Sequence, residues 1–255
     1  APPVPTLAVS ADETRAMDER LTEIGVGRED LIVGVNPGST YGGAKRWLPE
    51  RYAEAALRVC RRIEQQQGRP VSVVILGAKG EEELGYSVAE RLTVRSAVLS
   101  GRTNIRELMA VTKRCTILLT NDTGPMHMAA AFAVPVVAVF GPTDWRTTAP
   151  YGQEASIVRQ PVDCAPCLLR ECPIDHRCMT GVTVDMVTQA AVKQLGSVSG
   201  SSGLSGACDF NPANQINQTD QTNVLSGFTI FLDRDGTLNP DPGYIGSPDR
   251  FELFP

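Results

Sequence analysis

Short apolar runs alternate with longer amphipathic segments along the chain as far as Leu195. Such short runs are typical of strands buried on both faces of a parallel sheet. The predicted strands are Leu31–Val35, Val71–Leu76, Ala97–Leu99, Ile117–Leu119 and Val136–Phe140, with residues 156–158 as a candidate last strand. The segments between them predict helices over residues 11–24, 49–66, 81–92, 104–114, 125–133 and 183–195.

Small polar residues mark the places where several of these helices should begin. Ser10 and Glu13 have the spacing of a capping box. Thr103, Thr123 and Thr183 stand at predicted N-cap positions. Because strands alternate with helices at every step, the pattern predicts an α/β fold with a doubly wound parallel sheet and right-handed crossovers.

The turn after the strand at Ile117–Leu119 gathers several polar residues at a predicted helix start: Asp122, Thr123, Gly124 and His127. A helix that begins just past a central strand presents free N–H groups and the positive end of its dipole. Gly124 has no side chain, so a phosphate could approach the backbone there, and Asp122 and His127 supply polar contacts. We therefore favour a ligand site over the alternative, an ordinary capped crossover.

A second polar segment, residues 36–47, follows the first predicted strand. It is neither a P-loop nor a Gly-x-Gly-x-x-Gly turn, because Ala44 separates Gly43 from Lys45 and no Ser or Thr follows the lysine. Ser39 and Thr40 could nevertheless donate hydrogen bonds to an anion, and Lys45 offers a positive charge. A solvated loop is the equal alternative.

Composition and charge limit the class of protein. The chain has 255 residues, of which 42% are hydrophobic and 21% charged, as in an ordinary globular protein. Its net charge of -5 argues against a nucleic-acid partner. The N-terminal residues lack the basic and apolar regions of a signal peptide, and with no initiator Met they suggest a piece of a longer protein.

The seven cysteines do not form a regular disulfide framework, which favours a reducing cytoplasm. Cys164 and Cys167 have zinc-ligand spacing, whereas Cys172 and Cys178 do not repeat it. A zinc site at these four residues, with His176 nearby, is one interpretation, and a packed or oxidised loop is the other. Cys60 and Cys115 fall in or beside helical segments and are expected in the core.

Beyond Leu195 the composition changes abruptly. Residues 196–226 are rich in Gly and Ser and then in Asn, Gln and Thr, which predicts a flexible linker. Residues 228–232 predict a new strand that delivers Asp233 and Asp235 at its end. Residues two apart on a strand point the same way, so both carboxylates could share a phosphate and a Mg²⁺ ion. Asp233 would then attack phosphorus and Asp235 would protonate the leaving oxygen.

Three motifs together resemble the ADP-heptose:lipopolysaccharide heptosyltransferases, most closely the heptosyltransferase II subgroup: Asn36-Pro-Gly…Ala44-Lys-Arg-Trp-Leu-Pro49, Asn121-Asp-Thr-Gly-Pro-Met-His-Met-Ala-Ala-Ala131 and Phe140-Gly-Pro-Thr143. A cluster like Cys164–Cys178 also recurs in that subgroup. The resemblance covers about residues 1–195 and implies the C-terminal, donor-binding Rossmann-like half of a two-domain GT-B glycosyltransferase.

The resemblance also implies roles for individual residues. Those implied to contact ADP-heptose are Asp122, Thr123, Gly124 and His127, with Ser39, Thr40 and Lys45 on the diphosphate and Glu81 or Glu82 near the nucleoside. It implies no cofactor for transfer, a lipopolysaccharide core acceptor, and a catalytic base in an N-terminal acceptor half that this sequence lacks. The expected location is the cytoplasm, with peripheral contact at the inner membrane left open.

The motif Phe231-Leu-Asp-Arg-Asp-Gly-Thr-Leu-Asn239 resembles the first motif of haloacid-dehalogenase-type phosphatases, in particular the heptose-1,7-bisphosphate 7-phosphatase subgroup. We therefore expect a fusion of three parts: a donor-binding domain over residues 1–195, a linker over 196–226, and the start of a phosphatase domain over 227–255. Transfer is the first functional hypothesis, and phosphatase activity of the whole fusion is the alternative. A nicotinamide-binding domain and a metal-stabilised interaction module are two further rivals.

Overall fold

The computed structural model describes residues 6–153 and 156–198. The phosphatase-like strand, Asp233 and Asp235 lie outside the described residues, as does nearly all of the expected linker.

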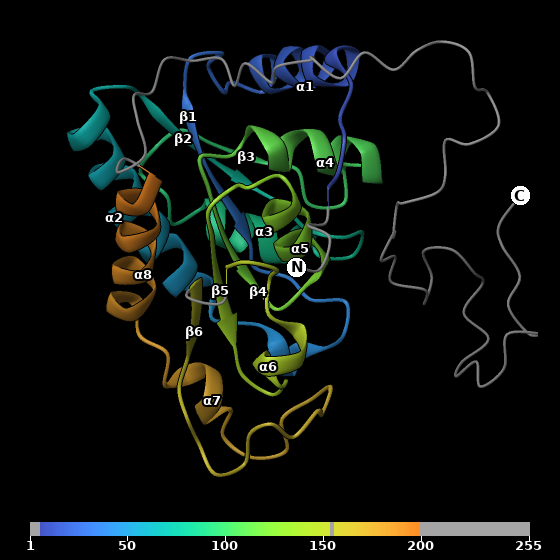
Figure 1. Ribbon diagram of the computed structural model, residues 1–255, viewed down its shortest axis with the longest axis vertical. Coiled ribbons are helices and arrows are strands. Elements are labelled where there is room, and N and C mark those ends of the chain that lie inside the picture. The colour runs from blue at the N-terminus through green and yellow to red at the C-terminus, as the bar shows by residue number, and fades with distance from the viewer. Residues whose placement is uncertain (1–5, 154–155, 199–255) are drawn as a thin grey trace, which may run out of the picture. The chain divides into compact units, whose positions relative to one another are not determined.

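A six-stranded sheet, parallel throughout, forms the centre of the described domain (Figure 1). Its strands are β1 (Leu31–Asn36), β2 (Val71–Ile75), β3 (Ser96–Val98), β4 (Ile117–Asn121), β5 (Val136–Phe140) and β6 (Ile157–Arg159). They lie in the order β3-β2-β1-β4-β5-β6. The predicted α/β fold and parallel sheet are confirmed, and each predicted strand is present within two residues of its expected ends.

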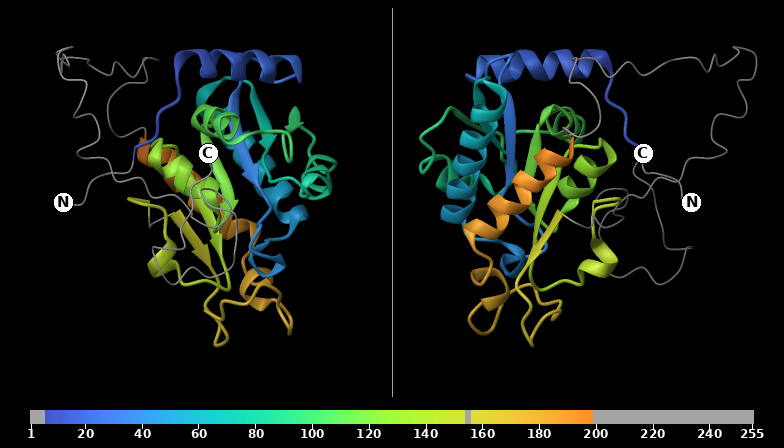
Figure 2. Two further views of the ribbon diagram at one scale, coloured as in Figure 1. Left: turned by 90° about the vertical axis from the view of Figure 1, so that its right-hand side faces the viewer. Right: turned by 60° about the vertical axis from the view of Figure 1, so that its left-hand side comes forward.

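Helices cover both faces of this sheet, and the views in Figure 2 separate the two layers. The longer helices are α1 (Ala11–Glu23), α2 (Pro49–Gln67), α3 (Glu82–Ala89), α4 (Ile105–Arg114), α5 (Gly124–Ala131) and α8 (Val184–Val198). Short turns are η1 (Gly43–Lys45), α6 (Trp145–Thr148) and α7 (Arg177–Thr180). One face packs against α2, α3 and α8, and the other against α1, α4 and α5. None of the helices in the described part of the chain combines the length and apolar character that crossing a membrane requires.

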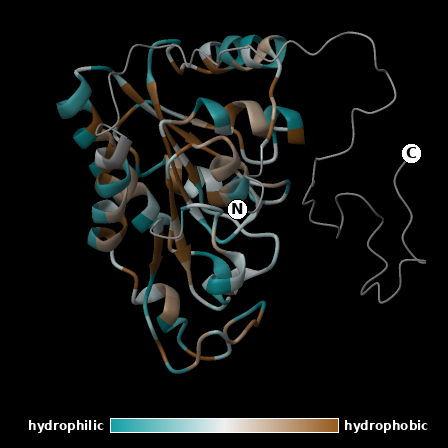
Figure 3. Ribbon diagram, in the orientation of Figure 1, coloured by the Kyte–Doolittle hydropathy of each residue, from teal (hydrophilic) through white to brown (hydrophobic). Residues whose placement is uncertain are grey.

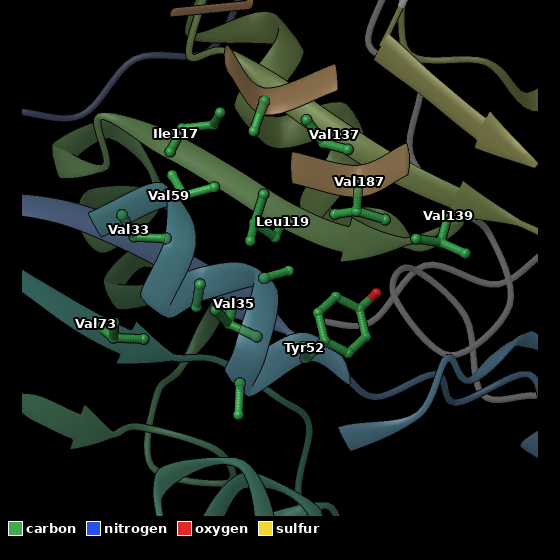
Figure 4. Packing of buried hydrophobic residues seen from close by; sticks show 14 of the residues in the cluster. Val33, Val35, Tyr52, Val59, Val73, Ile117, Leu119, Val137, Val139 and Val187 are labelled. Atoms are coloured by element: carbon green, nitrogen blue, oxygen red, sulfur yellow. The ribbon is translucent and has the colours of Figure 1, made fainter. Parts of the chain in front are cut away.

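Burial on both faces of the sheet explains why the strands consist mainly of apolar residues. All residues of β1, β2, β4 and β5 are buried, so both sets of alternating side chains need apolar partners. Figure 3 shows apolar strands inside and polar surfaces on the covering helices. In the layer of Figure 4, Leu119 of β4 packs in one cluster with Val59 of α2 and Val187 of α8.

Several helix ends differ from the predictions. Asn104, and not Thr103, caps α4: its side chain accepts from the Glu107 N–H, and the Glu107 carboxylate accepts from the Asn104 N–H. The capping box of α1 at Ser10 is confirmed. Helix α3 is shorter than predicted at both ends, and α8 continues through Val198, beyond the expected boundary at Leu195.

The strand order places a topological switch point between β1 and β4. From β1 the chain adds strands outward through β2 and β3, and from β4 it adds them in the opposite direction. Helices on the two sides therefore diverge at the carboxyl ends of β1 and β4, which is where open α/β sheets bind ligands. Both predicted ligand segments follow these two strands.

A buried carboxylate stabilises the opposite end of the sheet. Asp30 is 3% exposed, and its Oδ2 accepts hydrogen bonds from the Gly27 N–H at 3.0 Å, Ser72 Oγ at 2.5 Å and Arg95 Nη1 at 2.8 Å. Burial raises the pKa of Asp30, but these three donors outweigh it and the net pKa is lowered. The carboxylate thus joins the starts of β1, β2 and β3.

We expect Asp30→Asn to lower the free energy of unfolding by about 2 kcal/mol at neutral pH, because it removes the charge that strengthens these hydrogen bonds, of which the one from Ser72 is buried. A lowered folded-state pKa stabilises the fold above the unfolded-state pKa, and this stabilisation disappears as the pH falls through the folded-state pKa. Urea unfolding at several pH values should therefore show the difference shrinking in acid. Asp12→Asn, at an exposed pair with Arg15, is the control. A difference that does not change with pH would contradict this account.

Candidate functional site

Asn121, the last residue of β4, organises the site. It is fully buried, and its Oδ1 accepts hydrogen bonds from the Trp47 N–H at 3.0 Å and the Tyr52 hydroxyl at 2.8 Å. Its Nδ2 donates to the carbonyls of Pro37 at 2.8 Å and Gly38 at 3.1 Å. The side chain therefore holds both ends of the loop between β1 and α2 against the end of β4. No role was predicted for Asn121 from the sequence, although a polar residue at the end of a buried apolar run is a signal that could have suggested one.

Asp122 and Lys45 form a nearly buried ion pair beside Asn121. Lys45 Nζ lies 2.7 Å from Asp122 Oδ2, and the two side chains are 12% and 6% exposed. Thr143 Oγ1 donates to the same oxygen at 2.7 Å. The loop at residues 41–45 after β1 (the lysine loop), the turn after β4 and the turn after β5 therefore converge on one carboxylate. Thr143 ends the motif Phe140-Gly-Pro-Thr143, and this contact was not predicted from the sequence.

The first turn of α5 is open to solvent. Thr123 occupies the N-cap position, but its hydroxyl does not cap the helix as predicted. It instead accepts a hydrogen bond from Asn36 Nδ2 at 3.0 Å, across the switch point. Gly124 is exposed, and a Cβ atom added there would meet no atom within 4 Å. The structure thus leaves space at the positive end of the α5 dipole, as an anion site requires.

His127 lies one turn into α5, at an exposed position near the Asp122–Lys45 pair. Desolvation by neighbouring atoms lowers the pKa of His127, the Asp122 carboxylate opposes that change, and Lys45 adds to it. The imidazole therefore responds to the charges of both partners, and it can offer a neutral polar contact near neutral pH.

Ser39 and Thr40 differ sharply in their surroundings. Ser39 is 2% exposed, and its Oγ has no hydrogen-bond partner within the described residues. Thr40 is exposed. A buried hydroxyl without a partner is unfavourable, so Ser39 is the stronger candidate of the two for a ligand contact.

The structure separates Glu81 from Glu82. The Glu81 carboxylate is buried, accepts from the Ala78 N–H at 2.8 Å and lies 3.4 Å from Arg46 Nη2. A Cβ atom on Gly38 would fall 2.0 Å from Glu81 Oε2, so this carboxylate lies against the loop after β1. The Glu82 carboxylate instead accepts a hydrogen bond from the Gly80 N–H. Of the two alternatives, Glu81 is the residue that lies against the loop after β1, and Glu82 does not.

The described cysteines do not form a cluster with metal-ligand geometry. Among the described residues no three His, Cys, Asp or Glu side chains could together hold a metal ion. The predicted ligands line a small apolar cavity of about 80 Å³: Cys164, Cys167, Cys172 and Cys178. All four thiols are free, and the geometry gives the zinc prediction no support. Cys60 and Cys115 are buried in the core, as expected, and burial raises the pKa of each thiol to about 12.

The charges around His127 give a direct test of the site's electrostatics. Asp122→Asn should lower the pKa of His127 further, because it removes the negative charge that favours imidazolium and leaves Lys45 unpaired. Lys45→Met should raise the pKa of His127. Titration of the His127 ring protons by NMR measures both, with Asp12→Asn as the remote control. Shifts in the same direction, or no shifts, would show that the three groups are not coupled as described.

Comparison with known proteins finds similarity to heptosyltransferases. Lipooligosaccharide heptosyltransferase 2 of Campylobacter jejuni is 34% identical over 170 residues, which are 64% of this chain and 51% of that protein. Lipopolysaccharide heptosyltransferase 2 of Salmonella typhimurium is 30% identical over 159 residues, which are 61% of this chain and 43% of that protein. The chain therefore spans about half the length of these relatives.

Solved structures show the same fold. The structure of E. coli ADP-heptose lps heptosyltransferase II superposes with a TM-score of 0.61 at 24% identity, covering 78% of this chain and 56% of the other. A glycosyl transferase family 9 structure from Veillonella parvula gives the same TM-score and identity, covering 75% and 54%. Residues 1–177 match the family described as glycosyltransferase family 9 (heptosyltransferase). This match extends over more than half of the sequence, and the chain belongs to glycosyltransferase family 9.

Proposed function

We propose that this chain is the donor-binding half of a heptosyltransferase, which binds ADP-heptose for transfer of heptose to the lipopolysaccharide inner core. The observation that carries the proposal is the Lys45–Asp122 ion pair at the open start of α5, at the switch point of the sheet. The family and the names of the relatives, lipooligosaccharide and lipopolysaccharide heptosyltransferases, support the substrate class.

The diphosphate would lie over the first turn of α5. Gly124 and Thr123 would present the backbone there, and Lys45 would supply a positive charge within reach of the same turn. Ser39, whose hydroxyl has no partner among the described residues, would donate to a phosphate oxygen, with Thr40 at the exposed edge. Backbone donors, a lysine and a helix terminus together suit a diphosphate better than a neutral ligand.

The remaining polar groups would recognise the two ends of the donor. Asp122 uses Oδ2 for Lys45 and Thr143, so Oδ1 is the oxygen left for a sugar hydroxyl. His127 would contact the donor from the same turn. Glu81 would lie near the nucleoside, because it is buried against the loop that follows β1.

Transfer would proceed by attack of an acceptor hydroxyl on the anomeric carbon of the heptose. The bond from that carbon to the diphosphate oxygen breaks, and ADP leaves with the bonding electron pair. Lys45 and the α5 terminus would stabilise the negative charge that grows on the diphosphate. The base that takes the acceptor proton would come from the acceptor half implied by the family resemblance.

The geometry argues against the nicotinamide-binding rival. The β1–α2 loop lacks the glycine fingerprint and carries η1 and a lysine salt bridge where a dinucleotide fold has a tight turn into its helix.

Calorimetry with ADP tests the proposal. We expect weak binding that Lys45→Ala reduces by about tenfold or more, because it removes a charge-assisted contact. Asp122→Ala and His127→Ala should also weaken binding. Gly124→Ala is the sharpest variant: an added Cβ meets no protein atom, so folding should be unaffected while phosphate approach is blocked. Gly196→Ala, another position with open space, is the matched control. A folded sample that does not bind ADP at millimolar concentrations would overturn the proposal.

The motif at residues 231–239 supports a second proposal, that the full fusion also carries heptose-bisphosphate phosphatase activity through Asp233, Asp235 and Mg²⁺.

We expect neither the transfer reaction nor the phosphatase reaction from the 255-residue chain itself. For transfer, the family resemblance places the general base in the acceptor half, and such a base typically raises the rate by about 10²–10⁴-fold. For the phosphatase reaction, two carboxylates alone do not complete the coordination that Mg²⁺ requires. The assays are ADP-heptose with lipopolysaccharide acceptor, and heptose 1,7-bisphosphate with Mg²⁺. Turnover abolished by Asp122→Ala in the first, or by Asp233→Asn in the second, would contradict this expectation.

A further inference from the structure

The cysteine-rich loop, residues 164–178, docks on the lysine loop, residues 41–45. The Tyr41 hydroxyl donates to the Leu168 carbonyl at 2.6 Å, and the Gly43 N–H donates to Glu171 Oε1 at 2.9 Å. A Cβ atom on Gly42, whose φ is 153°, would lie 2.3 Å from the Arg170 carbonyl oxygen. The two loops are therefore in contact from Tyr41 to Gly43.

The peptide groups on both sides of Ala44 are fixed by this contact. The Ala44 N–H donates to the Arg170 carbonyl at 2.9 Å. The Ala44 carbonyl lies 2.7 Å from His176 Nε2. Because a carbonyl only accepts hydrogen bonds, His176 Nε2 must carry the proton and donate it. Ala44 directly precedes Lys45, so this bond fixes the peptide from which the Lys45 side chain reaches Asp122.

His176 is itself held rigidly. Its backbone has φ 57°, a left-handed conformation, and its N–H lies 3.2 Å from Cys172 Sγ. Its carbonyl accepts from the N–H groups of Met179 and Thr180 at the start of α7. A ring donor on a fixed backbone is a suitable device for holding a neighbouring loop.

We propose that His176 is a positioning residue of the donor site: by holding the Ala44 carbonyl it sets the lysine loop so that Lys45 lies over the start of α5. This inference rests on the proposed function for its consequence, the binding of a diphosphate. It assigns the cysteine-rich loop the role of a support for the lysine loop, with Cys172 holding the His176 N–H.

The test compares nucleotide affinities of variants in the full chain. His176→Ala should weaken ADP binding by about fivefold, the value of one neutral hydrogen bond. It should leave adenosine affinity unchanged, because adenosine has no phosphate for Lys45. His176→Gln keeps an amide donor and should restore most of the ADP affinity. Ile174→Ala, an exposed residue of the same loop, is the control and should bind both ligands normally.

A double-mutant cycle tests whether His176 affects ADP binding through Lys45. In a Lys45→Ala background, His176→Ala should weaken ADP binding no further, because the positioned group is already absent. Unchanged ADP affinity in His176→Ala, equal losses for ADP and adenosine, or full additivity with Lys45→Ala would each overturn the proposal.

A measurement without ligand separates this inference from the proposed function. Amide hydrogen exchange at Gly43 and Ala44 should speed up in His176→Ala and remain slow in His176→Gln and Ile174→Ala. If the unmodified chain fails to bind ADP but the exchange result holds, the proposed function fails and the loop coupling stands. If exchange at Gly43 and Ala44 is unchanged in His176→Ala, the coupling itself is wrong.

Discussion

The satisfaction of one buried amide is the constraint on which the site depends. Asn121 ends a strand that begins with three apolar residues, and its side chain has no access to water. A buried amide that lacks partners is costly, so its four contacts must all form when the domain folds. Those partners are the backbone of residues 37, 38 and 47 and the hydroxyl of Tyr52. The packing requirement of β4 thereby fixes a loop that precedes it by more than 70 residues.

The polar groups around Asn121 are arranged in a way that lowers the stability of the fold. The start of α5 has no side-chain cap, and Ser39 has a buried hydroxyl without a partner in the described structure. Asp122 and Lys45 are nearly buried charges, and such a pair gains little over apolar packing unless further hydrogen bonds support it. Thr143 gives that support, but the uncapped helix and the unpaired hydroxyl are not compensated locally. Departures of this kind cluster at functional sites, where a ligand completes the missing contacts.

The sequence predicted the sheet well because burial leaves a local signal. A strand enclosed on both faces consists mostly of apolar residues, and β1, β2, β4 and β5 all do, with their few polar residues buried. The hydrogen-bond partners of individual side chains leave no comparable local signal in the sequence. Thr123 was expected to cap α5, but its hydroxyl bonds to Asn36, which lies 87 positions away in the sequence. The choice between Glu81 and Glu82 depended on where α3 begins, since one residue along a helix turns a side chain by about 100°. Asn104 is different, because its spacing from Glu107 is itself a capping-box signal that the choice of Thr103 overlooked.

The cysteine-rich loop shows why residue spacing alone does not define a site. Cys164 and Cys167 have the separation found in zinc ligands, yet a metal needs the remaining donors at fixed distances and angles, which spacing does not determine. In this chain the loop's specific contacts run instead from its backbone, Glu171 and His176 to the lysine loop. A loop that bonds mainly through peptide groups can support a neighbour while most of its own side chains stay exposed. The polar contacts between this loop and the lysine loop are therefore made by residues between the cysteines.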